Sequence, residues 1–217
     1  MNKKKLLIFD LDGTLINSIE DLANSTNFAL QQCNYPTHPT NRYPLMVGNG
    51  INKLFERALP EGEKTAANIV RMRQAFLAHY SNHNTEKSYP YEGITNLLTT
   101  LHQSGYKLAV ASNKYQAGTQ KIVQHFFPQI PWAEIYGQQE GVPTKPDPTI
   151  VFKIMQQTQV KKEEILYVGD SGVDMQTAYR AKVDSVGVTW GFRTKEELVE
   201  NKAGFMVDRP KEILDLL

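Results

Sequence analysis

Short apolar runs alternate with longer stretches of helical periodicity along most of this chain. The run Lys5–Phe9 is almost wholly apolar, which is typical of a strand covered on both faces. Similar runs predict further strands at 107–111, 135–137, 165–168 and 185–188. Apolar residues at helical spacing predict helices at 94–104, 115–126, 148–158, 175–181, 195–201 and 210–217. Strands that alternate with helices predict an α/β fold, with a parallel sheet and helices on both of its faces.

The stretch 17–83 breaks this alternation, because its periodicity is mostly helical. We expect Asn17 or Ser18 to cap a first helix, and a loop at Asn34–Thr40 to follow it. Further helices are predicted at 51–59 and 61–81. A stretch of this length is too long for one crossover between parallel strands. It therefore predicts a helical cap subdomain over 16–87, inserted into a core made of 1–15 and 88–217.

Composition narrows the class of protein. With 217 residues, 41% of them hydrophobic and 22% charged, the chain has the make-up of an ordinary globular protein. The formal net charge is +1, which argues against nucleic acid as the main partner. No apolar run approaches the ~20 residues of a membrane span. A single cysteine, Cys33, excludes an internal disulfide and fits a reducing compartment. We expect a cytoplasmic protein, monomeric or homodimeric, without a nucleic-acid or membrane partner.

Polar residues follow the predicted strands at the points where these end. Asp10 and Asp12 come after the first strand. The later strands are followed by Ser112 and Asn113, by Lys145 across a short loop, and by Asp170 with Asp174 one turn on. In open parallel sheets the ligand crevice lies at the carboxyl ends of the strands. The sequence therefore predicts that carboxylates, a hydroxyl, an amide and an ammonium group meet at one edge.

This set of side chains suits phosphoryl chemistry. Carboxylates brought together repel one another, and a hard divalent cation such as Mg²⁺ removes the conflict. With neither His nor Cys among these residues, a zinc site is not expected. The lysine and the hydroxyl can donate to phosphoryl oxygens. One carboxylate can attack phosphorus. A second one, two residues further on at the Gly13 turn, can protonate the leaving oxygen.

The segments Asp10-Leu-Asp-Gly-Thr14, Ser112, Lys145 and Gly169-Asp-Ser with Asp174 resemble, in order, the four motifs of the haloacid dehalogenase superfamily. The resemblance covers essentially the whole chain, and the predicted insertion is similar to that superfamily's C1 helical cap. It implies a Rossmann-like core and an enzyme that acts on a small phosphorylated metabolite. Because the namesake dehalogenases lack a carboxylate at the position of Asp12, the chain is similar to the phosphate-handling branch.

The resemblance also implies a role for each motif residue. Asp10 would be the nucleophile and a metal ligand, and Asp12 the general acid and base, with its backbone carbonyl on Mg²⁺. Phosphoryl oxygens would be bound by Ser112 and Asn113, and Lys145 would neutralise Asp10 and the transferring group. Finally, Asp170 would be a metal ligand, and Asp174 would orient the metal shell.

A glycine-rich turn at Val47–Gly50 in the predicted cap resembles an element of phosphoglycolate phosphatases. Such a turn before a helix offers free N–H groups to a small anion. The resemblance therefore favours hydrolysis of 2-phosphoglycolate or another small organic phosphate. The residues expected to contribute to specificity in the cap are Arg42, Gly48, Asn49, Gly50 and Lys53, with Arg57 as a further nearby cation.

Other functions share these motifs. A sugar-phosphate isomerase similar to β-phosphoglucomutase would keep all four and differ in the cap. A pyrophosphatase or nucleotidase of the same superfamily would also keep them. A binding module without activity would be expected to have lost Asp12 or Lys145, and both are present.

Overall fold

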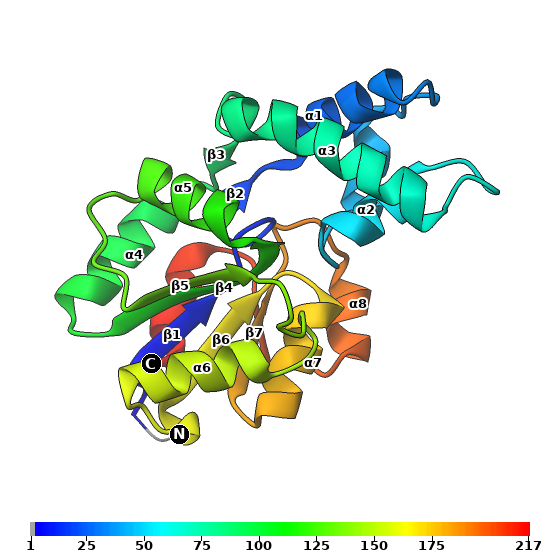
Figure 1. The fold of residues 1–217 in the computed structure, drawn as a ribbon. Helices are drawn as coiled ribbons and strands as arrows, with labels where there is room; N and C mark the ends of the chain where they lie inside the picture. The colour runs from blue at the N-terminus through cyan, green and yellow to red at the C-terminus, as the bar shows by residue number, and fades with distance from the viewer. Residues whose placement is uncertain (1–2) are drawn as a thin grey trace.

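A computed structural model of the chain describes residues 3–217 (Figure 1). It has two layers: a parallel sheet with helices on its faces, and a second group of helices beyond one edge of the sheet. The sheet has six strands in the order β5-β4-β1-β6-β7-β8, and each pairs in parallel with its neighbours. The strands are β1 (Leu6–Phe9), β4 (Lys107–Tyr115), β5 (Glu134–Gln138), β6 (Ile165–Gly169), β7 (Asp184–Val188) and β8 (Phe205–Val207). The predicted α/β fold with a parallel sheet is confirmed.

Alternate residues of the buried strand β1 face opposite sides of the sheet. Leu7 and Phe9 pack in one apolar cluster with α4 (Ile94–Gln103) and α5 (Gln116–Phe126). Leu6 and Ile8 pack in a second cluster with α6 (Thr149–Thr158) and α7 (Gly172–Ala181). Both faces are therefore covered, which explains why this strand is apolar throughout.

The inserted stretch forms the second layer, which lies beyond the carboxyl ends of the strands (Figure 1). It contains α1 (Ile19–Gln32), the 3₁₀ helix η1 (Thr40–Leu45), α2 (Ile51–Ala58) and α3 (Ala66–His83). A two-stranded antiparallel ribbon joins it to the sheet layer, formed by β2 (Ile16–Asn17) and β3 (Tyr89–Pro90). The chain thus leaves and returns at adjacent points, and the division at 15/16 and 87/88 stays a prediction.

Most predicted elements are present, with shifted ends. The helix expected from residue 61 begins only at Ala66, because Pro60–Lys64 forms a turn and the Thr65 side chain accepts a hydrogen bond from the Asn68 N–H. The helix expected at 210–217 is the 3₁₀ helix η3 (Pro210–Leu216). The remaining elements are η2 (Lys162–Glu164) and α8 (Lys195–Glu200).

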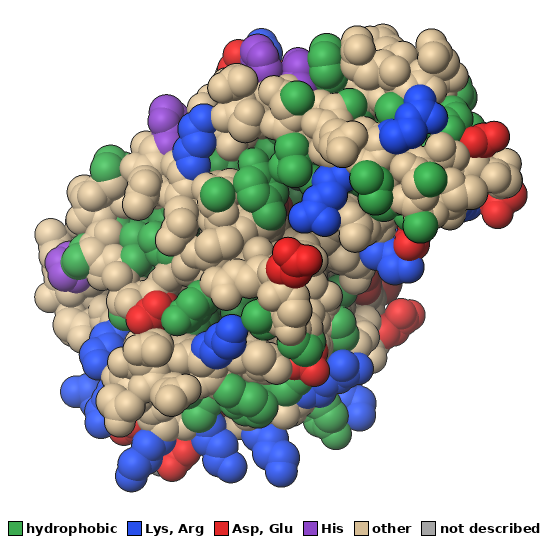
Figure 2. Space-filling model, viewed as in Figure 1, with side chains coloured by type: hydrophobic (Ala, Val, Ile, Leu, Met, Phe, Trp, Pro, Cys, Tyr) green, Lys and Arg blue, Asp and Glu red, His purple; other side chains and the backbone are tan. Residues whose placement is uncertain are grey.

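Three short strands, β2, β3 and β8, were not predicted from the sequence, because runs of two or three residues carry no usable periodicity. No helix within residues 3–217 is both long enough and apolar enough to cross a membrane. On the face shown in Figure 2, Lys and Arg side chains are scattered among neutral ones and are densest along the lower edge.

Candidate active site

The side chain of Lys145 joins two carboxylates that the sequence places far apart. Its Nζ lies 2.9 Å from Asp10 Oδ1 and 2.7 Å from Asp174 Oδ1, and it also donates to the Ala111 carbonyl at 2.9 Å. The lysine is only 3% exposed. Burial alone would lower the pKa of Lys145, but the Asp10 and Asp174 carboxylates raise it well above its ordinary value. Lys145 is therefore a fixed positive charge beside Asp10.

Three carboxyl groups meet next to this lysine. Asp10, Asp170 and Asp174 each offer an oxygen, and these oxygens lie within 4.8 Å of one another. Burial raises the pKa of Asp10 to about 7; Lys145 opposes this shift, whereas Asp174 and Asp12 add to it. Burial, and then Asp174 and Asp10, raise the pKa of Asp170 well above its ordinary value. A divalent cation would relieve this repulsion, and an all-oxygen set of this kind suits Mg²⁺.

The position of Asp170 depends on close approach by backbone. Gly13, with φ of +89°, passes so near that a Cβ there would lie 2.3 Å from Asp170 Oδ2. The Phe192 N–H donates to the same oxygen at 2.7 Å, and the Thr14 hydroxyl lies 3.4 Å from Oδ1. Asp174 is held differently, since its Oδ2 accepts from the Ser171 hydroxyl at 2.6 Å as part of the cap of α7. Asp174 thus supports both the helix and Lys145.

Asp12 lies apart from the acidic cluster. Its Oδ1 accepts from the Ser18 hydroxyl at 2.5 Å, and its Oδ2 lies 2.9 Å from Lys114 Nζ. Ser18 stands at the predicted start of α1, but its hydroxyl makes no helix-capping bond and reaches Asp12 instead. Lys114 Nζ also donates to the Tyr80 hydroxyl of α3 at 2.8 Å. Burial lowers the pKa of Lys114, but Asp12 and Tyr80 outweigh it and raise the pKa above its ordinary value.

Ser112 and Asn113 follow each other on β4, and both are buried. Ser112 faces the same cavity as Asp10 and Asp12. The Asn113 amide accepts from the Lys145 N–H at 2.8 Å and donates to the Lys145 carbonyl at 3.0 Å. It also donates to the Gly48 carbonyl at 3.1 Å. Asn113 therefore fixes the backbone of Lys145 and links it to the glycine-rich turn.

A cavity of about 60 Å³ lies between the sheet and the helical layer. Its polar wall comes from the sheet side and includes Asp10, Asp12, Ser112 and Lys114. The opposite wall is largely apolar and comes from the helical layer, through Leu22, Val47, Ile51, Leu54 and Phe76, with Tyr80 at its margin. The cavity therefore has one polar wall, with two carboxylates and an ammonium group, and one largely apolar wall.

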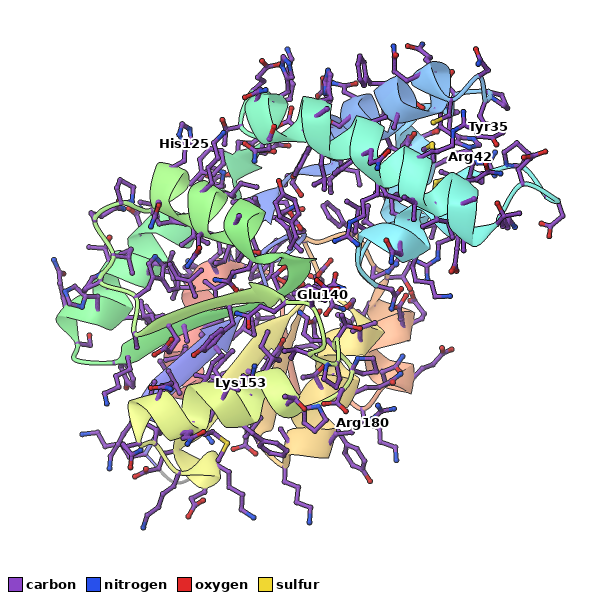
Figure 3. The ribbon with its side chains drawn as sticks, in the orientation of Figure 1. Tyr35, Arg42, His125, Glu140, Lys153 and Arg180 are labelled. Carbon is purple, nitrogen blue, oxygen red and sulfur yellow. The ribbon has the colours of Figure 1, made fainter. Side chains whose placement is uncertain are left out.

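The residues expected to give specificity in the cap lie in different places. Gly48 and Gly50 line the cavity, but Asn49 accepts at Oδ1 from Arg57 Nη2, 2.7 Å away, and lies outside the lining. Lys53 is exposed and pairs with Glu56. Figure 3 places Arg42 at the outer end of the helical layer near Tyr35, away from the edge of the sheet. The structure therefore brings only the glycines of this set to the cavity, and the role of the set in specificity stays a prediction.

Three residues that contact the site were not predicted as site residues: Lys114, Ser18 and Tyr80. Lys114 carried a signal, because it directly follows Ser112 and Asn113 at the end of a strand. Ser18 and Tyr80 carried no such signal. In the sequence Ser18 has the features of a helix cap and Tyr80 those of a buried helix residue, and their contacts with the site arise only when the sheet and the helical layer pack together. Arg193 lies in the loop after β7 and donates to the Pro44 and Val47 carbonyls at 2.5 and 2.8 Å, so it joins the two layers.

Comparison with known proteins identifies the family of this chain. A model of the haloacid dehalogenase-like hydrolase family matches residues 7–188, so the chain belongs to that family of hydrolases. It is 31% identical to the phosphoglycolate phosphatase of Pasteurella multocida, with complete coverage of both chains. The enzyme of the same name from Psychrobacter arcticus is 32% identical and covers 90% of this chain and 87% of its own.

Solved structures give the same result. A crystal structure from Haemophilus somnus, described as a predicted phosphoglycolate phosphatase, has a TM-score of 0.91 and 32% identity, and covers 100% of this chain and 99% of its own. A predicted phosphatase from Clostridium acetobutylicum has a TM-score of 0.88 at 23% identity, covering 99% and 100%, and shows the shared fold alone. The fold inferred from the sequence is therefore that of this family.

Proposed function

We propose that this chain is a Mg²⁺-dependent phosphatase that hydrolyses a small phosphomonoester, with 2-phosphoglycolate as its substrate. The observation that carries the proposal is the Lys145 ammonium held between Asp10 and Asp174, beside a cavity that Asp10 and Asp12 both line. A nucleophile, a proton donor and a fixed cation are the groups that phosphoryl transfer through an aspartate requires.

In this proposal the Asp10 carboxylate attacks phosphorus as the ester P–O bond breaks. The leaving oxygen takes a proton from Asp12, and an aspartyl phosphate remains on Asp10. Water then attacks that phosphorus, Asp12 takes its proton, and inorganic phosphate leaves with Asp10 regenerated. The Ser112 hydroxyl and Lys145 ammonium offset negative charge on the phosphoryl oxygens and on Asp10.

The acidic cluster fits the proposed metal. Asp10 and Asp170 would hold Mg²⁺ with their carboxylates, together with the Asp12 backbone carbonyl, while Asp174 keeps Lys145 and the end of α7 in place. Bound Mg²⁺ would supply positive charge to the phosphoryl oxygens. Burial and the neighbouring carboxylates raise the pKa values of Asp10 and Asp170, and a bound divalent cation would stabilise their ionised forms.

The size of the cavity and the names of the relatives support a small substrate. The cavity of about 60 Å³ contains the proposed phosphoryl site and leaves little room beyond it, which favours a small leaving group. The full-length relatives at about 30% identity are phosphoglycolate phosphatases by name. The buried, free Cys33 supports the proposed cytoplasmic location.

A substrate panel tests the proposal. We expect release of inorganic phosphate with the highest kcat/KM on 2-phosphoglycolate, and much lower values on a hexose phosphate, a nucleoside monophosphate and pyrophosphate. Activity should disappear with a chelator and return with Mg²⁺. Migration of phosphate on a sugar would instead show an isomerase, and unchanged turnover in the chelator would overturn the metal assignment.

A further inference from the structure

Two buried donors at the margin of the cavity have hydrogen-bonding capacity left over. Lys114 Nζ carries three protons. Its hydrogen-bond acceptors within residues 3–217 are Asp12 Oδ2, 2.9 Å away, and the Tyr80 hydroxyl, 2.8 Å away. The Tyr80 hydroxyl accepts from Lys114, and it has no acceptor for its own proton in that part of the chain. One N–H and one O–H are thus unused side by side.

Both groups are deeply buried. The Lys114 side chain is 4% exposed and Tyr80 is fully buried. A buried donor without a partner costs free energy, so a partner that enters the cavity would be bound favourably. Both residues line the cavity, and Lys114 supplies the only ammonium or guanidinium group in its described lining. The pair therefore offers an anion in the cavity one positive charge and two hydrogen-bond donors.

The position of the pair relates it to the leaving group of the substrate. Asp12, which would protonate the ester oxygen, is in direct contact with Lys114. In a two-carbon phosphorylated acid a single carbon separates the ester oxygen from the carboxylate. A carboxylate on the leaving group would therefore come within reach of Lys114 and Tyr80 once the ester oxygen meets Asp12.

We propose that Lys114 Nζ and the Tyr80 hydroxyl together bind the carboxylate of the substrate, one donor to each carboxylate oxygen, and so select α-phosphorylated carboxylic acids. The proposal rests on the phosphatase function proposed above and gives a structural source for its substrate preference. The sheet layer supplies the charge and the cap supplies the hydroxyl, so the subsite is complete only when α3 lies over β4. The exposed Lys53 and the remote Arg42 have no part in it.

The test compares two esters of nearly equal size. One is 2-phosphoglycolate and the other is 2-hydroxyethyl phosphate, in which a hydroxymethyl group replaces the carboxylate. The measured quantity is the kcat/KM for 2-phosphoglycolate divided by the kcat/KM for 2-hydroxyethyl phosphate, and we expect this ratio to be well above one in the wild type. Lys114→Met should lower that ratio on the order of tenfold to a hundredfold, the usual range for a hydrogen bond to a charged group. Tyr80→Phe should lower it by about tenfold.

Tyr80→Phe keeps the ring stacked on Phe76 and leaves the ion pair of Asp12 with Lys114 intact, so it remains informative if Lys114→Met folds poorly. Tyr43→Phe is the matched control, because it removes another buried cap hydroxyl, bonded to Asn27 and outside the cavity, and should leave the ratio unchanged.

The outcomes separate this subsite from the proposed function. A wild-type ratio near one would overturn the substrate proposal and the subsite together. A high wild-type ratio that persists in both variants, with the two esters losing activity equally, would overturn the subsite alone. In that case Lys114 would only position Asp12.

Discussion

The Lys145 ammonium lies 2.9 Å from the Asp10 carboxylate, and the two residues come from different loops at the same edge of the sheet. Asn113 fixes the Lys145 backbone on one side, and Asp174 binds its Nζ on the other. The lysine thus has one position available to it, and that position faces the proposed nucleophile.

Lys145→Met should therefore abolish most of the activity. The substitution keeps the length of the side chain but leaves the Asp10 and Asp174 carboxylates buried without their cation. Loss of one charge-stabilising donor typically costs about 10²–10³ in kcat. Turnover of p-nitrophenyl phosphate measures the effect, with Lys211→Met as a control at an exposed lysine. Activity within a fewfold of wild type would contradict the role given to Lys145.

Gly13→Ala should destabilise the protein and disturb the acidic cluster. A Cβ at this position would overlap Asp170 Oδ2, and φ is +89°. Gly62→Ala is a matched control, because φ there is +90° and nothing lies within 4 Å of an added Cβ. The backbone strain should lower the free energy of unfolding by about 1 kcal/mol in both variants. Gly13→Ala adds the clash with Asp170, so its total loss should be roughly 2–4 kcal/mol. Urea unfolding measures both, and equal losses would show that Asp170 moves aside freely.

The stability of the metal-free protein should fall as the pH rises from about 4 to about 7. Burial raises the pKa of Asp10 to about 7 in the folded chain, against an ordinary value of 3.8. Between these values the folded state keeps a proton that the unfolded state has lost, so a higher pH favours unfolding. Above pH 7 the cost reaches on the order of a few kcal/mol.

Asp10→Asn should reduce the slope of this dependence, with the part that comes from Asp170 remaining, and make the metal-free protein more stable above pH 7. Asp147→Asn serves as the control, because hydrogen bonds from Thr149 lower the pKa of Asp147 and it titrates below this range. The measurement is urea unfolding in a chelator at several pH values. An Asp10→Asn variant with the wild-type slope would show that Asp10 is already ionised in the folded state at low pH.

Arg193→Met should weaken the contact between the two layers. The guanidinium donates to two carbonyls of the helical layer, those of Pro44 and of Val47, the first residue of the glycine-rich turn. We expect a loss of about 1–3 kcal/mol in stability and a rise in KM, since the turn is held less firmly over the cavity. Arg193→Lys keeps the positive charge but should recover only part of the lost stability, because lysine lacks the planar guanidinium that reaches both carbonyls. An unchanged KM in both variants would contradict this role.

The sequence predicted the core of this protein well, for a physical reason. Buried parallel strands such as Lys5–Phe9 are apolar throughout, and the polar residues that end them stand at the same edge whatever the details of packing. That rule was sufficient to select Asp10, Asp12, Lys145 and Asp170. The structure brings the side chains of Asp10, Lys145 and Asp170 together with Asp174, and it pairs Asp12 with Lys114 instead.

The cap was harder to predict, because its contributions depend on how two layers meet. Cations near the glycine-rich turn in sequence, such as Arg42 and Lys53, point away from the cavity, since helical spacing places them on the outer face. Tyr80 lies near the C-terminal end of α3 and is not part of any recognisable sequence motif. Its contact with Lys114 exists only in three dimensions.

The most direct test of the proposed mechanism is to look for a phosphoryl group on Asp10. The protein is mixed with 2-phosphoglycolate and Mg²⁺, quenched in acid within one turnover, digested and analysed by mass spectrometry. We predict one added phosphoryl group on the peptide that contains Asp10, and none in Asp10→Asn. Full turnover with no phosphorylated peptide at any quench time, or a phosphoryl group on another residue, would contradict the account.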